Sequence, residues 1–461
     1  MYFDTPSHDL AKNEMAMRLR RSGRQWVQSL KSGASGAGGL HERDEWESDR
    51  PGPSIDLSLF AQTPLAKLPD AESLHRNLGE IFRVEVARST WELEIEPGTR
   101  VEIALDRGEV RNSRGAEPIS EVEIEILEGE RRAVFDFAER LVEEAPLRPS
   151  ALTKAQRGYR LAGRGKTGAV KSRAAKLTRG MTPLDAARAS IGAALTQMQA
   201  NESGALTTSD PEYLHQLRVA LRRLRTALRV FREVLDPEFA RFMDGELRTV
   251  ARSTGASRDW DVFATQTLPE FLDAYGDAPT RRAIMARAAA KRRAAREAMR
   301  ESLRSPRHAR TMLALARWLS QPPQGAANDS ESLAKFAARA VRKRHRKLAA
   351  RGKDAAHLDA AARHKLRIEA KRVRYAFEAF APLFPRKRVE AYLKALSELQ
   401  DDLGAANDAV VAAALARELA LPAAAAKLAR RWFAAQERAG AALMARHFDK
   451  LAATRHFWEE R

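Results

Sequence analysis

The stretch 215–225 reads HQLRVALRRLR, and it recurs at 364–374 as HKLRIEAKRVR, an offset of 149 residues (364 minus 215). At the same offset Phe231 corresponds to Phe380, and GASRD at 255–259 corresponds to GAAND at 404–408. A constant offset over more than forty residues indicates an internal duplication, and duplicated units usually pack as related halves.

Each copy of the repeated stretch predicts an amphipathic helix that carries a row of cations. Residues three and four positions apart share one helix face, so the cations align beside a separate apolar face. A solvated basic face is the simplest interpretation, but like charges four residues apart are mildly destabilising, and arginine suits bidentate phosphate contacts. We therefore predict that phosphate groups are bound by His215, Arg218, Arg222, Arg225, His364, Arg367, Lys371 and Arg374.

His215 and His364 stand at the head of the two rows. A metal site is not expected there, because no cysteine and no second nearby histidine completes a ligand set. A neutral histidine donates one hydrogen bond, and protonation adds a positive charge. Phosphate binding is therefore expected to strengthen below a pKa of about 6.5.

The charge of the chain is divided unevenly along its length. Residues 161–461 carry 57 Lys and Arg against 32 Asp and Glu, whereas residues 1–160 carry 23 against 29, and the whole chain has a net charge of +19. A region this basic is expected to bind a polyanion, which could be nucleic acid, an anionic membrane surface or polyphosphate. The absence of cysteine excludes disulfides, thiolate nucleophiles and cysteine metal sites.

Residues 1–130 alternate between apolar and polar positions, which predicts strands at 17–20, 26–31, 82–86, 101–105 and 121–126 and a hairpin at the Gly/Ser stretch 32–39. Charged side chains share one face of several strands. An antiparallel sheet with one wet side explains this pattern. A barrel with a charged lumen explains it as well, with cations gripping phosphate oxygens and carboxylates holding a hard divalent cation. A helix at 130–145 follows, and from Pro183 onward the pattern is helical.

A series of motifs in the first 160 residues resembles the CYTH domain, the triphosphate tunnel family of inorganic triphosphatases and class IV adenylate cyclases. The motifs are YFDTP at 2–6, MRLR at 17–20, WVQSLK at 26–31, RDE at 43–45, DRG at 106–108, EVEIE at 121–125 and KAQRGY at 154–159. The resemblance implies an antiparallel β tunnel over residues 1–157. It implies phosphate binding by Arg18, Arg20, Lys31, Arg43, Arg88 and Lys154, and Mg²⁺ or Mn²⁺ binding by Glu121, Glu123, Glu125 and Asp106.

The repeated helix, together with RDWD at 258–261, resembles the CHAD domain, the conserved-histidine α-helical domain. The resemblance implies an all-α domain at 182–455, built of two pseudo-symmetric four-helix bundles with a basic groove that binds inorganic polyphosphate. A basic linker at 158–181 would join the two domains, so the fold class expected is α+β multidomain. Asp259, Asp261 and Asp408 are expected to pair with arginines and to fix the geometry between helices.

One element of the CYTH pattern does not occur near the start of this sequence. The first strand of the family carries a Glu-x-Glu-x-Lys signature, which supplies metal-binding carboxylates and a phosphate-contacting lysine before the YFDTP segment. Here Met1 directly precedes Tyr2. We expect either a gene start further upstream or a tunnel without that strand, so polyphosphate binding is the first predicted activity and triphosphate hydrolysis the second.

Nucleic-acid binding is the alternative function, because phosphate recognition uses the same residues. The basic rows lack interleaved aromatic residues for base stacking, since Tyr375, Phe231 and Phe380 fall mostly on core positions. A purely structural helical scaffold is a third interpretation, but a scaffold does not require paired rows of cations. Linear polyphosphate has no bases to read, so a dense arginine groove is sufficient to bind it.

No apolar run in the sequence is long enough to span a bilayer, and Asp4, His8 and Asp9 interrupt any apolar core of a signal peptide. We therefore expect a cytoplasmic protein with no membrane partner. The predicted binding of polyphosphate adds the expectation that it associates with polyphosphate granules. The partners expected are inorganic polyphosphate or triphosphate, and the pattern makes no prediction about the oligomeric state.

Overall fold

The alternating segments of the first 130 residues form one antiparallel sheet. The computed structural model describes residues 1–35, 38–68, 71–163, 168–171, 173–274, 278–321, 331–454 and 456–458. Its strands run in the order β4-β3-β2-β1-β5-β6-β7. Their bounds are β1 Tyr2–Asp4, β2 Met15–Ser22, β3 Gln25–Ser35, β4 Glu42–Arg50, β5 Gly79–Glu96, β6 Thr99–Asn112 and β7 Gly115–Glu128. Every predicted strand lies within one of these elements, and residues 36 and 37 of the predicted hairpin loop lie outside the described residues.

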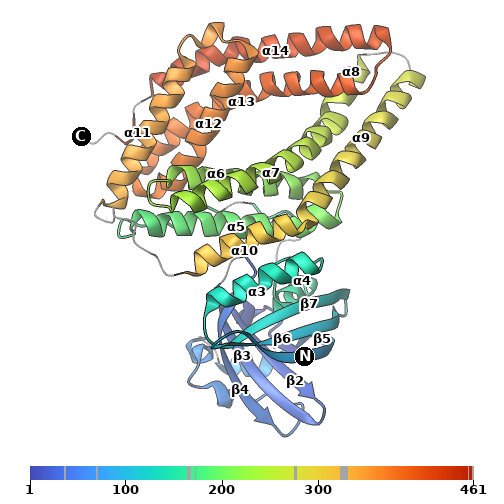
Figure 1. Cartoon of the computed structure of the whole chain (residues 1–461), viewed down its shortest axis with the longest axis vertical. Helices are drawn as coiled ribbons and strands as arrows, with labels where there is room; N and C mark the ends of the chain where they lie inside the picture. The colour runs from blue at the N-terminus through green and yellow to red at the C-terminus, as the bar shows by residue number, and fades with distance from the viewer. Residues whose placement is uncertain are drawn as a thin grey trace. The chain divides into compact units, whose positions relative to one another are not determined.

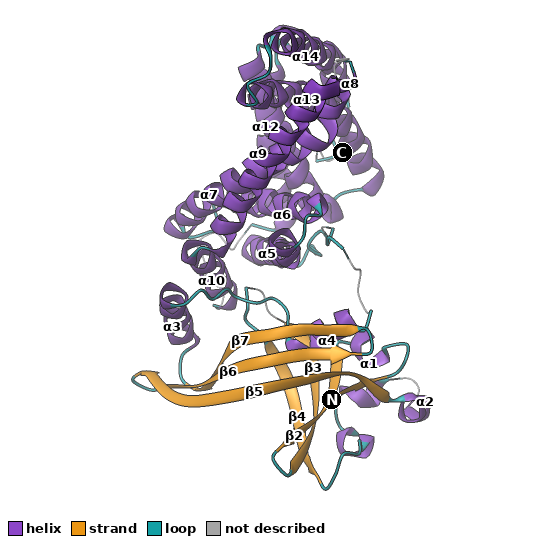
Figure 2. Ribbon diagram, turned by 90° about the vertical axis from the view of Figure 1, so that its right-hand side faces the viewer, coloured by secondary structure: helices purple, strands orange, loops and turns teal. Residues whose placement is uncertain are grey.

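The sheet curls, so that β2, β3 and β4 cross the direction of β5, β6 and β7 (Figure 2). The predicted antiparallel, tunnel-like sheet is therefore confirmed. Short helices accompany it, with bounds α1 Asp9–Lys12, α2 Ala71–Asn77, α3 Arg131–Glu144 and α4 Lys154–Leu161 and 3₁₀ turns η1 Leu57–Phe60 and η2 Pro64–Lys67. The helix predicted at 130–145 is α3.

The strand register separates apolar from charged side chains. Met17 pairs with Leu30 across β2 and β3, and both side chains are fully buried in a cluster that includes Phe60. Because successive side chains in a strand point to opposite faces, Arg18 and Lys31 project from the other face. Around this pair, one face of β2 and β3 builds a core and the opposite face presents charges.

From Pro183 onward the described chain is helical (Figure 1). The helices are α5 Pro183–Thr207, α6 Pro211–Val230, α7 Pro237–Val262, α8 Leu268–Asp273, α9 Ala278–Arg304, α10 Pro306–Ser320, α11 Leu333–Gly352, α12 Ala360–Phe380, α13 Arg386–Glu418 and α14 Ala423–Ala452, with a π-helical turn η3 Phe263–Thr267 and 3₁₀ turns η4 Ala355–His357 and η5 Ala381–Leu383. None of the helices over the described residues has the length and apolar character needed to cross a membrane.

The starts of the first three long helices follow from local sequence. Thr182, Asp210 and Asp236 are N-caps whose side chains accept hydrogen bonds from the backbone of the first turn, and each precedes a proline at the start of the helix. A proline at that position costs no hydrogen bond, because the first N–H groups of a helix have no intrahelical partner. Pro183, Pro211 and Pro237 therefore each begin a helix.

The helices form two groups that lie side by side in Figure 1. The first group contains α5, α6, α7 and α9, the second contains α11, α12, α13 and α14, and α6 contacts α12 between them. The apolar face predicted for α6 is buried throughout, as is that of α12. Burial of these faces leaves the cationic faces of α6 and α12 available for other contacts.

The chain divides into two compact units. The first comprises Met1–Ala169 with Ala309–Ser320, and the second comprises Val170–His308 with Gln321–Arg461. In the first unit, Ala309, Leu313 and Ala316 pack on Phe135 and Val142 of α3. The predicted boundaries assigned 309–320 to the helical domain, and α4 extends into the range predicted as a linker. Gly165 and Lys166 of that linker lie outside the described residues.

Candidate phosphate-binding and metal-binding sites

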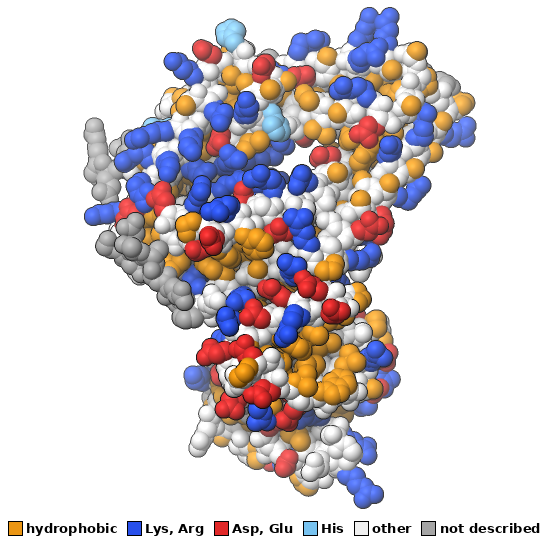
Figure 3. Space-filling view, viewed as in Figure 1, with side chains coloured by type: hydrophobic (Ala, Val, Ile, Leu, Met, Phe, Trp, Pro, Cys, Tyr) orange, Lys and Arg blue, Asp and Glu red, His pale blue; other side chains and the backbone are white. Residues whose placement is uncertain are grey.

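Cations from α6 and α12 meet in the helical unit, where basic side chains gather on the face shown in Figure 3. We call Arg218, Arg222, Arg367 and Lys371 the central cation cluster. The charges of Arg222 and Arg367 both lower the pKa of Lys371, and the charge of Arg367 also lowers the pKa of Arg218. The four side chains are therefore close enough to interact electrostatically. The two copies of the repeated stretch therefore contribute to one site.

Burial is the main cause of the perturbed pKa values in the central cation cluster. Burial, followed by the charges of Arg222 and Arg367, lowers the pKa of Lys371 to about 7. Burial also lowers the pKa of Arg218 to about 10, although Asp259 opposes the shift. Desolvation disfavours the charged form of a cation, so these side chains are held in a place where an anion would stabilise them.

Few carboxylates neutralise the central cation cluster in the part of the chain that the structure describes. Arg367 lies 3.8 Å from Asp408, and its Nε is buried with no hydrogen-bond partner. Burial raises the pKa of Asp259, although Arg218 opposes the shift. Arg222 donates a hydrogen bond of 2.9 Å to the hydroxyl of Tyr375. The sequence pattern placed Tyr375 on a core position, but its side chain is only half-buried.

The other predicted members of the rows have different surroundings. Arg225 lies 3.4 Å from Asp244, and Arg374 lies 2.8 Å from Glu378. His364 is exposed and its Nδ1 lies 2.8 Å from the side-chain oxygen of Asn407. His215 is half-buried, and burial followed by the charge of Arg258 lowers its pKa, so it would gain a proton only below the value expected from the sequence.

Among the aspartates predicted to pair with arginines, Asp261 does so most completely. Its buried carboxylate lies 2.6 Å from Arg292 and 3.0 Å from Arg296, both on α9. These bonds join α7 to α9 and fix the position of α7, which packs on α6.

In the first unit, three predicted phosphate ligands share the charged face of β2, β3 and β4. Arg18 lies 3.3 Å from both Glu45 and Glu47, Arg20 lies 3.6 Å from Glu47, and Lys31 lies 2.8 Å from Glu45. The strand register creates this arrangement, because Arg18, Ser29 and Glu47 stand in one row across the three strands. Arg43, at the start of β4, is half-buried, and its Nε has no hydrogen-bond partner in the described part of the chain.

Three predicted metal ligands meet on β6 and β7. Oxygen atoms of Asp106, Glu121 and Glu123 all lie within 4.8 Å of one another, and we call these residues the carboxylate trio. Glu125 stands on the same face of β7, since it is an even number of residues from Glu121 and Glu123, but it lies outside the trio. Arg88 on β5 lies 2.6 Å from both Asp106 and Glu123.

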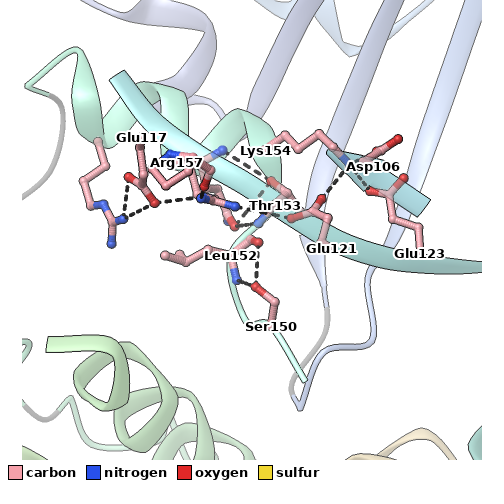
Figure 4. Close-up of polar contacts among 12 residues, drawn as sticks. Asp106, Glu117, Glu121, Glu123, Ser150, Leu152, Thr153, Lys154 and Arg157 are labelled. Atoms are coloured by element: carbon pink, nitrogen blue, oxygen red, sulfur yellow. Dashed lines mark hydrogen bonds and ion pairs between the residues drawn. The ribbon is translucent and has the colours of Figure 1, made fainter. Parts of the chain in front are cut away.

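Lys154 is bound directly to all three members of the trio (Figure 4). Its Nζ lies 2.6 Å from Asp106, 2.5 Å from Glu121 and 2.8 Å from Glu123. Although burial opposes the shift, hydrogen bonds from Arg88 and Lys154 hold the pKa of Asp106 below its usual range. The same two cations lower the pKa of Glu123 against the effect of burial, so both carboxylates are held in the ionised form that a metal ligand requires.

The helix α4 places Lys154 at the trio. Thr153 and Gln156 form a capping box that begins the helix directly before Lys154. The helix then packs on the ring of Phe82 through Gly158, where an added Cβ would lie 2.1 Å from a ring carbon. Tyr159 also stacks edge-on against Phe82. The position of the ammonium group thus depends on a close approach that only glycine permits.

The donor set of the trio fits a hard divalent cation. Mg²⁺ and Mn²⁺ prefer oxygen ligands, and the trio offers carboxylate oxygens with no sulfur or nitrogen among them. Arg88 and Lys154 stand beside these oxygens and could balance the negative charge of bound phosphates. The arrangement is suited to a metal–phosphate complex.

One residue near the trio was missed by the sequence interpretation. His41 precedes β4, and its Nε2 lies 3.2 Å from the backbone oxygen of Ser150. Burial lowers the pKa of His41, while the charges of Glu123 and Glu121 oppose that shift. His41 is therefore close enough to interact electrostatically with the trio. No sequence signal indicated this, because the proximity arises from the curl of the sheet and not from spacing along the chain.

Comparisons with known proteins match these two parts of the chain. The model of the CYTH domain matches residues 1–159, and the model of the CHAD domain matches residues 189–417. An inorganic triphosphatase of Haemophilus influenzae is 32% identical over 165 residues, which are 35% of this chain and 44% of that protein. The chain thus matches less than half the length of that relative.

A solved structure resembles the helical part. The crystal structure of the CHAD domain from the plant Ricinus communis is 34% identical in sequence, with a TM-score of 0.54. The match covers 63% of this chain and 98% of the plant domain.

Proposed function

Because the chain belongs to the family of two-domain proteins that join a CYTH domain to a CHAD domain, we propose that its helical unit binds inorganic polyphosphate through the central cation cluster. The observation that carries the proposal is the contact between α6 and α12, which brings Arg218 and Arg222 together with Arg367 and Lys371, and burial there lowers the pKa of Lys371 to about 7. A half-buried group of cations is costly without a counter-anion, and a chain of phosphates supplies one charge after another along its length.

Arginine chemistry supports phosphate as the ligand. The guanidinium group binds phosphate through two parallel hydrogen bonds, and the cluster combines arginines from two helices that are far apart in sequence. Arg225 and Arg374 already have carboxylate partners, so they are expected to contribute less to binding than Arg218, Arg222, Arg367 and Lys371.

The surroundings of the cluster favour polyphosphate over nucleic acid. Base stacking requires an accessible aromatic face. Tyr375, which contacts the cluster, is half-buried and lies under the guanidinium of Arg222 at 5.7 Å. Polyphosphate has no bases, so it needs only the cations. Binding to polyphosphate would also recruit the protein to polyphosphate granules.

The test compares polyphosphate affinity in the full chain with and without the arginines of α6. The double variant Arg218→Ala with Arg222→Ala is expected to bind long-chain polyphosphate at least about tenfold more weakly at physiological salt. The control variant Arg430→Ala with Arg431→Ala removes the same charge from an exposed part of α14. Unchanged affinity in the α6 variant, with its fold intact by circular dichroism, would contradict the proposal.

Competition with duplex DNA tests the alternative function. Long-chain polyphosphate is expected to displace DNA at a far lower concentration than DNA displaces polyphosphate. Equal competition would instead reduce the cluster to general electrostatic attraction for polyanions.

For the first unit, we infer metal-dependent hydrolysis of triphosphate as a second function. Asp106, Glu121 and Glu123 would hold Mg²⁺ or Mn²⁺, and the cations that face the lumen would bind the phosphates. A bound divalent cation would polarise a phosphoryl oxygen and orient water for attack. The cations proposed as phosphate ligands are Arg18, Arg20, Lys31, Arg43, Arg88 and Lys154.

The residues of this chain would contribute mainly by positioning and charge neutralisation. Glu45 pairs with Arg18 and Lys31, and Glu47 pairs with Arg18, so these cations are positioned on the charged face before substrate arrives. Arg88 and Lys154 each bind more than one carboxylate, so either could keep one bond while forming a new bond to phosphate. The release of phosphate from tripolyphosphate, measured with Mg²⁺ and with Mn²⁺, tests this function. The variant Glu121→Gln should lose the activity, whereas Glu128→Gln, at the far end of β7, should retain it.

A further inference from the structure

A second concentration of cations lines a cavity of about 720 Å³ between α6, α7, α11 and α12. Nine lysine and arginine side chains line this lateral cavity, against two carboxylates, Glu233 and Asp244. All of the lining residues belong to the helical unit. The cavity is within the size range of sites that bind small molecules.

The two carboxylates neutralise only part of this charge. Asp244 lies 2.8 Å from Arg229 and 2.9 Å from Arg248, and Glu233 lies 3.0 Å from Lys343. Glu233 also pairs with Arg339, which binds Glu331 outside the lining as well. In the part of the chain that the structure describes, the side chains of Arg232, Arg241 and Lys347 make no ion pair or hydrogen bond. The lateral cavity therefore has cations that are free to bind an anion.

The deeper cations of the lateral cavity are also poorly compensated. Arg344 is half-buried, and burial lowers its pKa, as does the charge of Arg372, although Glu369 opposes the shift. Arg372 forms an ion pair of 2.6 Å with Glu369, but its Nε is buried without a hydrogen-bond partner among the described residues. Burial lowers the pKa of Arg229, on the opposite wall, and Arg372 contributes to that shift. An anion within the cavity would relieve this crowding of like charges.

The lateral cavity is not repeated by the internal duplication. At the offset of 149 residues, Arg229 and Arg232 correspond to Glu378 and Ala381, and Arg241 and Arg248 correspond to Glu390 and Ser397. The central cation cluster draws on both copies, whereas the cations that α6 and α7 contribute to the lateral cavity occur in one copy only. Packing of the shared fold therefore does not require them.

We propose that the lateral cavity is a second anion site, separate from the central cation cluster, which binds a compact ligand with several clustered phosphate groups. Most of its cations are arginines, which suit phosphate oxygens. The one aromatic residue of its lining, Phe336, is buried, and the guanidinium of Arg339 lies over its ring at 5.2 Å. The lining thus offers no open platform for a nucleobase, and the ligand is recognised by its phosphates alone. Anion binding at the lateral cavity would be a further function of the helical unit, and it does not depend on polyphosphate binding by the central cation cluster.

The test uses the full chain with tripolyphosphate as the probe, at physiological salt, and hydrogen–deuterium exchange as the local measurement. Tripolyphosphate is expected to slow amide exchange in peptides that cover 336–347 of α11. The cavity variant, Arg232→Ala with Arg241→Ala and Lys347→Ala, should lose this protection and bind the probe at that site at least about tenfold more weakly. The matched control variant, Lys427→Ala with Arg430→Ala and Arg431→Ala, should keep it.

A cluster variant, Arg218→Ala with Arg222→Ala, separates this inference from the proposed function. Protection of 336–347 that persists in the cluster variant supports an independent site. Protection that disappears there would overturn the inference, because the cavity would then only extend the central cluster. A different result would contradict polyphosphate binding by the central cation cluster, namely unchanged affinity of the cluster variant for long-chain polyphosphate.

Two further measurements test whether the site is selective for phosphate and whether its ligand is a compact molecule. Sodium sulfate at matched ionic strength should not protect 336–347, and equal protection by sulfate would overturn the inference. Long-chain polyphosphate is compared with tripolyphosphate at equal phosphate concentration. Protection by the long chain alone would also overturn it, since the ligand would then be a segment of polymer and not a compact molecule.

Discussion

Lys154 Nζ lies 2.6 Å from Oδ2 of Asp106, whose side chain has no exposed surface. The ammonium group also binds Glu121 and Glu123, so it occupies the space between the three carboxylates. A divalent cation that uses the same oxygens needs that space. Lysine and metal are therefore expected to compete for the carboxylate trio.

Removal of the lysine should strengthen metal binding. The variant Lys154→Met keeps the aliphatic stem and removes the charge, so the apparent dissociation constant for Mn²⁺ should fall by about tenfold or more. Titration followed by electron paramagnetic resonance of free Mn²⁺ measures this without reference to catalysis. The control is Arg160→Met on the same helix, which loses an ion pair to Glu117 outside the trio. Equal Mn²⁺ affinity in Lys154→Met and the parent protein would show that lysine and metal do not compete.

The position of α4 should depend on the contact between Gly158 and Phe82. A Cβ at residue 158 would overlap the ring, so Gly158→Ala is expected to destabilise the protein by about 1–3 kcal/mol. Chemical denaturation provides the measurement. Combining Gly158→Ala with Phe82→Leu should recover part of the loss, because the smaller side chain makes room. Full additivity of the two changes would mean that this contact does not determine the position of the helix.

Polyphosphate binding should take up protons near neutral pH. Lys371 has a pKa of about 7 in the free protein, and an adjacent phosphate would raise it, since the anion stabilises the ammonium form. Binding above pH 7 therefore adds a proton to Lys371, and affinity should fall as pH rises, by up to about tenfold per pH unit. Calorimetry in buffers of different ionisation enthalpy measures the uptake.

A conservative substitution provides the control for this pH dependence. Lys371→Arg keeps the positive charge but does not titrate in this range, so the affinity between pH 7 and 9 should become nearly constant. If Lys371→Arg keeps the full pH dependence, another group is responsible for it. His215 is not expected to be that group, because its lowered pKa places its titration below pH 6.5.

Asp261 should be essential for stability of the helical unit. Asp261→Ala leaves Arg292 and Arg296 without their buried partner, and breaking a buried ion pair in this way costs about 3–5 kcal/mol. Asp273→Ala is the comparison, since Asp273 pairs with Arg281 at an exposed position and should change the unfolding free energy by less than about 1 kcal/mol. Similar melting temperatures for the two variants would contradict this assignment.

Local patterns in the sequence were sufficient for much of the architecture. Alternation predicted the strands, because a half-buried strand must place apolar residues at every second position. The leucines of α6 and the phenylalanines of α12 predicted which faces are buried, and those faces are buried. The ordered motifs indicated the two families, which the comparisons confirm.

Within the candidate sites, the sequence indicated residue types but not their partners. The cations of the two rows were predicted as phosphate ligands without distinction, yet Arg225 and Arg374 have carboxylate partners and Arg218 and Lys371 lie in a poorly compensated cluster. Spacing along one helix cannot predict which side chains of a neighbouring helix will face it. Likewise, alternation along β7 predicts that Glu125 shares a face with Glu121 and Glu123, but it cannot predict which of the three lie close to Asp106.

The sequence by itself determined the helices, the strands, the buried faces and the kinds of charge that each face carries, because these depend on residues a few positions apart. Only the tertiary structure decided that Arg222 meets Lys371, that Lys154 enters the carboxylate trio, and that cations of α6, α7, α11 and α12 line one cavity. These contacts join residues far apart in the chain, and their energies depend on burial and on the distance between charges, which the fold alone sets.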